Sequence, residues 1–422
     1  MERWLGPLAG VERHRLDNGL EVRLVPSARA PIVVAALLYR VGARDEPPAQ
    51  GGIAHFLEHM MFKGSDRFPM GSIDRLTQSL GGENNAFTSH DVTAYHFSFS
   101  SEHWRLALDI EADRMERLTL AEVEIERERE VILEEISMYE DDPWDALELH
   151  VNASYYGPFP YARPILGTRE TVRAIDREAL ERFYRAHYRP DNAVLVLAGD
   201  LPAGALEEVA ARLGRTEAGG NRRGHWSEPF AEPPGLRRVH VEKGKVPRLL
   251  VALPAPSANH PNFAAWRLWF AILGGGRSSR LHRRLVDDGM LCSAMSADLT
   301  EMAGPGIGAI SAELLPGIEP AAVEKVVLES LDELRLEPPS AAELENARRL
   351  LLADWVFGME RIQRQAIAVG HAEAVFDAGH PARQLEDLLK CRWEDLAGAA
   401  QRQLAATDGP GGVVGWSWAG SH

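Results

Sequence analysis

The chain has 422 residues, a net charge of −16, and 45% hydrophobic and 26% charged residues. One hydrophobic core stops growing near roughly 250–300 residues, so this length predicts two domains of similar size. The composition is that of a folded globular protein. An acidic chain without a Lys/Arg-rich run lacks the basic face that nucleic acids need, so we expect no nucleic-acid partner. The acidity either serves solubility or favours cationic ligands.

Its two cysteines, Cys292 and Cys391, lie far apart in the sequence. They indicate neither a disulfide framework nor a cysteine zinc site. The first residues lack a charged-then-apolar signal pattern, and the longest apolar run, near residues 32–39, is far shorter than the ~18 residues that span a bilayer. We therefore expect a cytoplasmic protein without membrane contact, or a periplasmic one if a leader was removed.

The first half of the chain mixes strand and helix signals. Runs of β-branched residues, and runs in which apolar and polar residues alternate, predict strands. The run at residues 72–82, which ends at two glycines, predicts a helix. These expected elements are strands at 20–27 and 31–43, helices around 54–60 and at 72–82, a hairpin at 85–100, and mostly helix from 101 to 139 with a break near 118–121.

A helix, an Asp/Pro turn and an apolar strand follow one another at residues 176–201, and the same order returns at 392–417. This similarity indicates a duplicated module. Residues 216–235 are polar and rich in Gly and Pro, as expected of a linker. We therefore predict an α+β protein with two homologous halves, 1–215 and 236–422, each an antiparallel-rich sheet with helices packed on it.

The segment "AHFLEHM" (54–60) carries two histidines and a glutamate at helical spacing. Residues i and i+4 share a helix face, so His55 and His59 can bind one metal ion. Glu58 lies on the same side and can act as the general base toward a water molecule. This His-x-x-Glu-His order is the inverted form of the common zinc-peptidase motif.

A hydrolytic zinc site needs a third protein ligand. When residues 122–140 are projected as a helix, Val123, Ile125, Val131, Ile132, Leu133, Ile136 and Tyr139 fall mainly on one side. Glu128 and Glu135 lie nearest the centre of that side, where an unpaired carboxylate is costly. We predict Glu135 as the third ligand and Glu128 as a carboxylate that orients a ligand histidine.

Two simpler interpretations stay open from the residues alone. A His-x-x-Glu-His sequence arises by chance, and the inward glutamates can instead pair with Arg127 or Arg129. Residues 84–89 can be an ordinary edge strand.

Several segments together resemble the pitrilysin-type zinc metallopeptidases, in particular the group of the mitochondrial processing peptidase and its short bacterial relatives. The segments that carry the resemblance are "GARDEPPAQGGIAHFLEHMMFKGS", "GGENNAFTS", "EREREVILEEI", "LGTRETV" and "LGGGRSSRLHRRL". The resemblance implies zinc bound by His55, His59 and Glu135, with Glu58 as base and Glu128 as the supporting glutamate. It also implies two homologous halves, and two such chains that close around a peptide.

In such enzymes the peptide binds as an added strand on a sheet edge. The resemblance places this edge at Asn84, Asn85, Ala86, Phe87 and Thr88.

Active relatives also carry an arginine and a tyrosine seven residues apart in the second half. The matching positions here are Val286 and Ser293, and neither can stabilise an oxyanion. We therefore expect a zinc endopeptidase subunit whose homologous, zinc-free partner supplies the Arg/Tyr pair in a heterodimer. The alternatives are a non-catalytic scaffold of the same fold and a zinc hydrolase of non-peptide amides.

Overall fold

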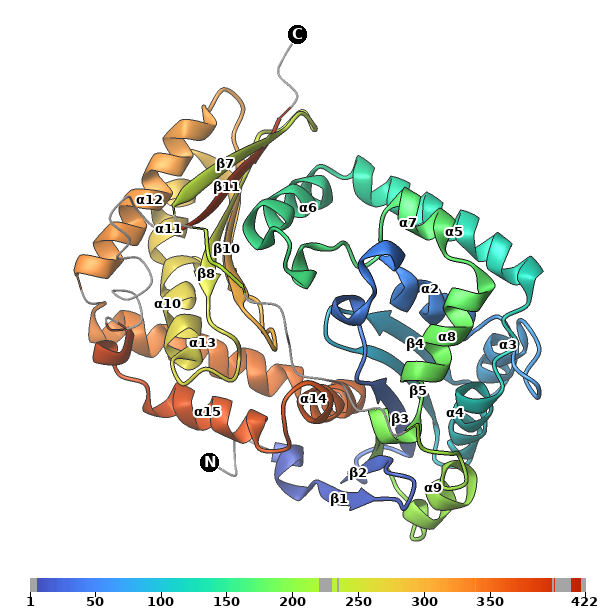
Figure 1. Ribbon diagram of the computed structural model, residues 1–422. Helices are drawn as coiled ribbons and strands as arrows, with labels where there is room; N and C mark the ends of the chain where they lie inside the picture. Colours follow the sequence, from blue (N-terminus) through green and yellow to red (C-terminus); the bar gives the residue numbers. More distant parts are fainter. Residues whose placement is uncertain are drawn as a thin grey trace. The chain divides into compact units, whose positions relative to one another are not determined.

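The computed structural model describes residues 6–219, 230–233, 235–337, 339–396, 398 and 411–418. The chain forms two compact units, which are described separately (Figure 1). The first unit contains residues 1–136, 163–226 and 357–381, and the second contains 137–162, 227–356 and 382–422. No helix among the described residues is long and apolar enough to cross a membrane.

A six-stranded sheet forms the centre of the first unit, in the order β1-β2-β6-β3-β5-β4. All neighbours are antiparallel except β2 and β6. The strands are β1 (Glu12–Arg15), β2 (Glu21–Pro26), β3 (Ile32–Tyr39), β4 (Glu83–Thr88), β5 (Thr93–Ser100) and β6 (Ala193–Gly199). β6 is buried along its whole length, because helices cover both faces of the sheet.

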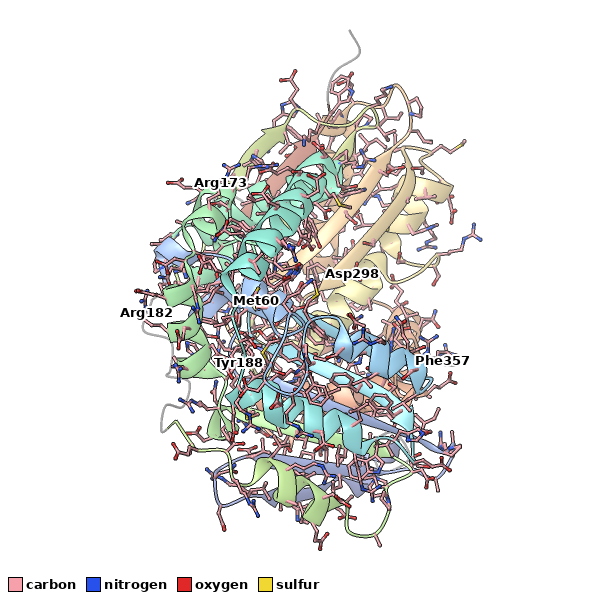
Figure 2. The ribbon with its side chains drawn as sticks, turned by 90° about the vertical axis from the view of Figure 1, so that its right-hand side faces the viewer. Met60, Arg173, Arg182, Tyr188, Asp298 and Phe357 are labelled. Carbon is pink, nitrogen blue, oxygen red and sulfur yellow. The ribbon has the colours of Figure 1, made fainter. Side chains whose placement is uncertain are left out.

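One face of this sheet packs on the larger helical layer, which holds the core of the unit. Alternate residues of β3, such as Val33, Leu37 and Tyr39, point into this core. The helices of the unit are α2 (Ile53–Met60), α3 (Ser72–Ser79), α4 (Arg105–Glu116), most of α5 (Glu122–Asp141), α7 (Arg169–Ala174), α8 (Arg177–His187), α9 (Ala205–Leu213) and α14 (Ile362–Val375). Figure 2 shows Arg182, on α8, pointing outward.

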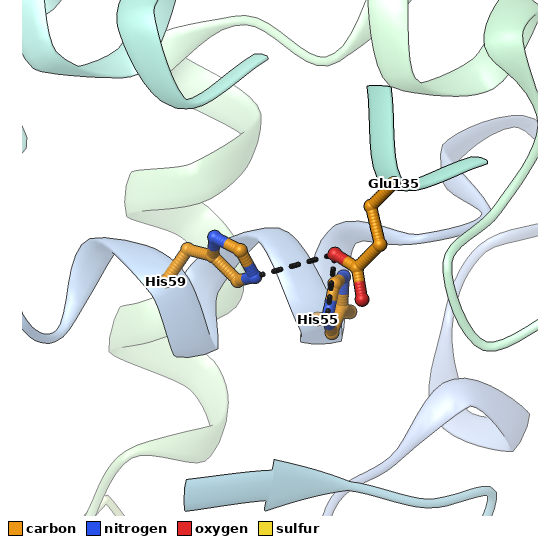
Figure 3. A group of neighbouring side chains, drawn as sticks. All are labelled: His55, His59 and Glu135. Carbon is orange, nitrogen blue, oxygen red and sulfur yellow. Dashed lines mark ion pairs between the residues drawn. The ribbon is translucent and has the colours of Figure 1, made fainter. Parts of the chain in front are cut away.

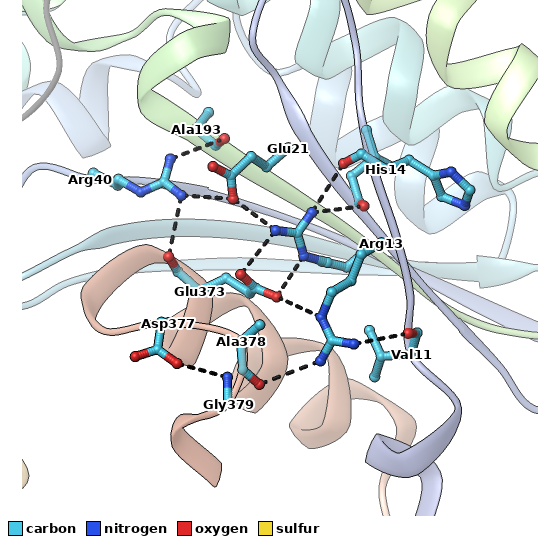
Figure 4. A network of polar contacts seen from close by, with 12 residues as sticks. Val11, Arg13, His14, Glu21, Arg40, Ala193, Glu373, Asp377, Ala378 and Gly379 are labelled. Carbon is cyan, nitrogen blue, oxygen red and sulfur yellow. Dashed lines mark hydrogen bonds and ion pairs between the residues drawn. The ribbon is translucent and has the colours of Figure 1, made fainter. Parts of the chain in front are cut away.

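The opposite face of the sheet is covered by α14, which comes from the second half of the sequence. Gly370 lies so close to β3 that an added Cβ would be 2.2 Å from Leu38 Cδ1. Beside it, the Arg23 guanidinium donates to both carboxylate oxygens of Glu373 at 2.6 and 2.9 Å. Figure 4 shows Glu373 within the surrounding network of polar contacts. The side chains of Arg23 and Glu373 are both buried, so this ion pair fixes α14 to the sheet.

A five-stranded sheet forms the centre of the second unit, in the order β7-β11-β8-β10-β9. Its strands are β7 (Leu236–Val241), β8 (Arg248–Ala255), β9 (Cys292–Leu299), β10 (Gly306–Leu314) and β11 (Gly412–Ser417). β7 and β11, the first and last strands of this sheet in chain order, are parallel neighbours, as β2 and β6 are in the first unit. The other neighbouring pairs of the sheet are antiparallel. Taken in chain order, β7 to β11 repeat the connectivity of β2 to β6. The α+β architecture with two related halves is therefore confirmed.

The helix that lies on β11 in the second unit, α6 (Pro143–Tyr156), comes from the first half of the sequence. Gly415 allows this contact, since an added Cβ would lie 2.4 Å from Val151 Cγ2. The other helices of this unit are α10 (Phe263–Gly274), α11 (Arg280–His282), α12 (Pro320–Leu336), and most of α13 (Ala341–Gly358) and α15 (His380–Lys390).

The two units therefore differ from the expected halves, 1–215 and 236–422, by the exchange of the segments that hold α6 and α14. An amphipathic helix carries no signal for which of two similar sheets it covers, so sequence periodicity gives no warning of the exchange. Most of the expected linker and of the helix expected after residue 392 lie outside the described residues.

Candidate metal centre

Helix α2 carries the His-x-x-Glu-His segment and is fixed at its first turn. Gly52 precedes it with φ = 91°, and an added Cβ there would lie 2.5 Å from the Leu166 carbonyl oxygen, so only glycine fits. The buried Glu46 carboxylate accepts hydrogen bonds from the backbone N–H groups of Gly52 and Ala54, both at 2.9 Å. These bonds satisfy donors that a helix start leaves free.

The apolar residues of α2 are buried in the core of the first unit, and its polar residues lie on the remaining side. His55 and His59 are one turn apart, with ring centroids 4.6 Å from each other. Their spacing on the helix thus gives two imidazoles on one side, as the sequence predicts.

Helix α5 presents the two glutamates that the helical projection selects. Its buried residues include Ile125, Glu128, Ile132, Leu133 and Ile136, whereas Glu126, Glu130 and Glu134 are exposed.

The projection is wrong for Val123, Val131 and Tyr139, which are 56%, 49% and 42% exposed. These residues lie outside the buried strip of the helix. The covered strip is therefore narrower than the apolar pattern of the sequence suggests.

Glu135 reaches the two histidines (Figure 3). Its Oε2 lies 3.7 Å from Nε2 of His55 and 3.7 Å from Nε2 of His59. One ligand atom from each of the three residues lies within 4.8 Å of the others. Two imidazole nitrogens and a carboxylate oxygen at this spacing match the three protein ligands of a catalytic zinc site, with a fourth position left open.

Glu128 forms a hydrogen bond with the ring nitrogen of His59 that does not face Glu135. Its Oε2 lies 3.0 Å from Nδ1 of His59, and its Oε1 lies 2.6 Å from Nζ of Lys63. A carboxylate accepts but does not donate, so Nδ1 of His59 carries the proton and Nε2 is free to bind a metal.

The two arginines that offered an alternative role for the inward glutamates have other partners. Arg127 pairs with Glu124, and Arg129 pairs with Glu126 and with the carbonyl oxygen of Val172. Neither takes up Glu128 or Glu135.

The electrostatics of the group favour metal binding. Burial, with a smaller contribution from His59, lowers the pKa of His55 to about 3, so its imidazole is neutral. Burial alone would raise the pKa of Glu128, but the hydrogen bonds from His59 and Lys63 outweigh it and keep the carboxylate ionised. Burial raises the pKa of Glu135 above its ordinary value. A half-buried carboxylate beside the neutral imidazole of His55 is stabilised by a cation.

Glu58 occupies the turn between the two histidines. Its Oε2 accepts a hydrogen bond from the Thr88 hydroxyl at 2.5 Å. Burial raises the pKa of Glu58, and the hydrogen bond from Thr88 partly opposes this shift. A carboxylate with a raised pKa is suited to accept a proton and release it again.

The segment expected to bind substrate forms β4, the edge strand of the first sheet. Among the described residues β4 pairs only with β5, so its other edge carries free backbone groups. Asn84, Asn85, Ala86, Phe87 and Thr88 all lie on this strand, and Thr88, at its end, is the one that contacts Glu58.

Three contacts around the site were not predicted from the sequence: Lys63 with Glu128, Thr88 with Glu58, and Glu46 with the start of α2. Lys63 lies beyond the end of α2 at Met60, so helical spacing does not predict its contact with Glu128. Thr88 is distant in sequence from Glu58, and only the tertiary fold brings the two together. Glu46 precedes its partners by six and eight residues, and its contact depends on the path of the loop before α2.

Val286 and Ser293, the residues at the expected Arg/Tyr positions, belong to the second unit. Val286 lies in the π-helical turn Arg283–Asp287, and Ser293 is an exposed residue of β9 whose hydroxyl donates to the Glu313 carbonyl oxygen at 3.3 Å. Neither side chain is a cation or a phenol.

The fold and this group of ligands define the class as a two-module protein with an inverted zinc-peptidase motif. Two family models match in succession, the insulinase (peptidase family M16) model over residues 22–169 and the peptidase M16 inactive domain over 174–351.

An uncharacterized zinc protease of Mycobacterium leprae is 32% identical over 86% of this chain and 82% of its own length. A zinc protease of Helicobacter pylori is 28% identical over 82% of this chain and 79% of its own length.

Solved structures share the fold. A protease from Helicobacter pylori matches with a TM-score of 0.89 and 24% identity, over 97% of this chain and 99% of that chain. Pitrilysin matches with a TM-score of 0.79 and 20% identity, over 97% of this chain and 45% of that chain. The chain belongs to peptidase family M16.

Proposed function

We propose that this chain is a zinc-dependent endopeptidase that cleaves peptides or unstructured protein segments. The observation that carries the proposal is the convergence of His55, His59 and Glu135 on one point, with Glu58 between the histidines on the same helix. The names of its relatives as zinc proteases support the same function.

In this proposal His55, His59 and Glu135 hold the zinc ion, and Glu128 fixes the orientation of His59. When bound, zinc supplies Lewis-acid activation of water and of the peptide carbonyl group. Glu58 accepts a proton from the attacking water and delivers it to the leaving amine, which its raised pKa favours.

The free edge of β4 supports a peptide substrate in an extended conformation. Backbone pairing along Asn84 to Thr88 would hold the peptide with little dependence on its side chains. This places the peptide on the strand whose last residue contacts the general base.

We also propose that the active enzyme is a heterodimer. An oxyanion donor contributes about 3–4 kcal/mol to lowering a barrier of this kind. The side chain of Val286 has no donor, and the hydroxyl of Ser293 donates to the Glu313 carbonyl oxygen, so neither supplies the cation or the phenol of the expected pair. A homologous chain without the zinc ligands would supply the arginine and the tyrosine.

A cleavage assay on an unstructured peptide tests both parts. The zinc-loaded chain is assayed alone and mixed with a homologous chain that carries the Arg/Tyr pair, and Glu58→Gln serves as the control. We expect cleavage in the mixture only, lost in the Glu58→Gln variant. Full activity of the single chain would contradict the heterodimer, and a zinc-loaded mixture without peptidase activity would favour the scaffold alternative.

A further inference from the structure

The carboxylate of Glu58 has one hydrogen-bond partner among the described residues, the hydroxyl of Thr88. This bond occupies Oε2 and leaves Oε1 without a partner in the described part of the chain. The carboxylate of a glutamate turns easily about its last side-chain bond, which has a broad, roughly two-fold preference. Its orientation at this site therefore depends on a single donor.

Thr88 is itself held firmly in place. It ends β4 and pairs with Thr93, which begins β5. In the turn that follows, the backbone N–H of Ser89 donates to the Val92 carbonyl oxygen at 2.8 Å, and the Ser89 hydroxyl oxygen accepts from the N–H of Val92 at 3.0 Å.

The segment that leads toward α2 packs against this turn. The N–H groups of Ala43 and Arg44 donate to the carbonyl oxygens of Ser89 and His90 at 3.0 and 3.2 Å. Gly42 makes the approach possible, because an added Cβ would lie 2.4 Å from the Ser89 carbonyl oxygen. The turn beside Thr88 is thus anchored on two sides.

We propose that Thr88 is a positioning residue for the general base. Its hydroxyl donates to Oε2 of Glu58 and holds the carboxylate so that Oε1 is the oxygen that accepts the proton. A threonine suits this role because branching at Cβ restricts its rotamers, and a hydrogen bond to a charged acceptor is stronger than one between neutral groups.

This role rests on the proposed peptidase function and differs from a contact with substrate. A residue that contacts the peptide in both the ground state and the transition state changes KM, whereas one that orients the base changes kcat. The two roles of Thr88 are therefore separable by kinetics.

The test compares Thr88→Val, which keeps the shape and removes the hydroxyl, with Thr88→Ser, which keeps the hydroxyl, each assayed in the mixture with the homologous chain that carries the Arg/Tyr pair. We expect Thr88→Val to lower kcat by about 10- to 100-fold, the scale of a misplaced catalytic group, with KM within about twofold and zinc content unchanged. Thr88→Ser should recover most of the loss. Thr119→Val removes an exposed hydroxyl elsewhere in the first unit and should leave kcat unaltered.

Full kcat in Thr88→Val, or a change confined to KM, would overturn the positioning role. A high-resolution crystal structure of each zinc-loaded variant gives a readout that does not need activity. We expect one Glu58 conformer in the wild type and in Thr88→Ser, and a displaced or split Glu58 carboxylate in Thr88→Val. An unchanged Glu58 conformer in Thr88→Val would refute the inference even if the proposed peptidase activity failed in every assay.

Discussion

At the scale of single residues, the candidate site consists of three side chains that could hold a metal ion and of the groups that contact them. The grouping of these three side chains could be predicted because its signals are local: a four-residue spacing for His55 and His59, and a costly inward carboxylate for Glu135. The contact of Thr88 with Glu58 could not, since only the fold brings the two residues together.

The contact between Glu128 and His59 can be tested through zinc affinity. Replacing the glutamate with glutamine in Glu128→Gln keeps the shape but removes the charge that orients His59, so we expect zinc affinity to fall by roughly 10- to 100-fold. Competition with a chelator of known affinity measures the change. The matched control is Glu130→Gln on the exposed side of the same helix, and equal affinities in the two variants would show that Glu128 has no role in zinc binding.

At the scale of elements, the sequence predicts β2 to β6 of the first unit but not β1, β9 and β10, and it does not predict which sheet each helix covers. The buried strands β3 and β6 and the hairpin of β4 and β5 follow from runs of apolar and β-branched residues. The residue pattern of α14 does not indicate which of the two sheets the helix covers. Its attachment to the first sheet depends on Gly370 and Glu373, which the apolar periodicity of the helix does not single out.

The ion pair between α14 and β2 can be tested through stability. Removing the charge in Glu373→Gln leaves the guanidinium of Arg23 with the carboxylate of Glu21, 2.8 Å from its Nη2, as an anionic partner. We expect the free energy of unfolding to fall by about 1.5–3 kcal/mol, as for a lost hydrogen bond to a charged group. Urea unfolding measures it.

The control for this change is Glu181→Gln, which breaks an exposed pair with Arg185 on α8. Exposed pairs contribute about 0–1 kcal/mol, so this variant should unfold almost as the wild type does. A loss in Glu373→Gln no larger than in the control would mean that packing at Gly370, and not the ion pair, holds α14.

At the scale of the whole molecule, the chain repeats one strand connectivity in two sheets, and its candidate metal ligands lie on helices α2 and α5 of the first unit. The repeat was visible as two similar helix-turn-strand segments, so the number and class of the modules could be predicted from sequence. The exchange of α6 and α14 could not, because two sheets of the same design offer similar apolar faces to any amphipathic helix.

Zinc stoichiometry shows whether His55, His59 and Glu135 form a zinc site. Equilibrium dialysis followed by elemental analysis is carried out on the wild type, on His55→Ala and His59→Ala, and on His103→Ala as an exposed histidine control. We predict one zinc ion per chain in the wild type and in His103→Ala, and almost none in the two ligand variants. Full zinc content in His55→Ala and His59→Ala would contradict the account.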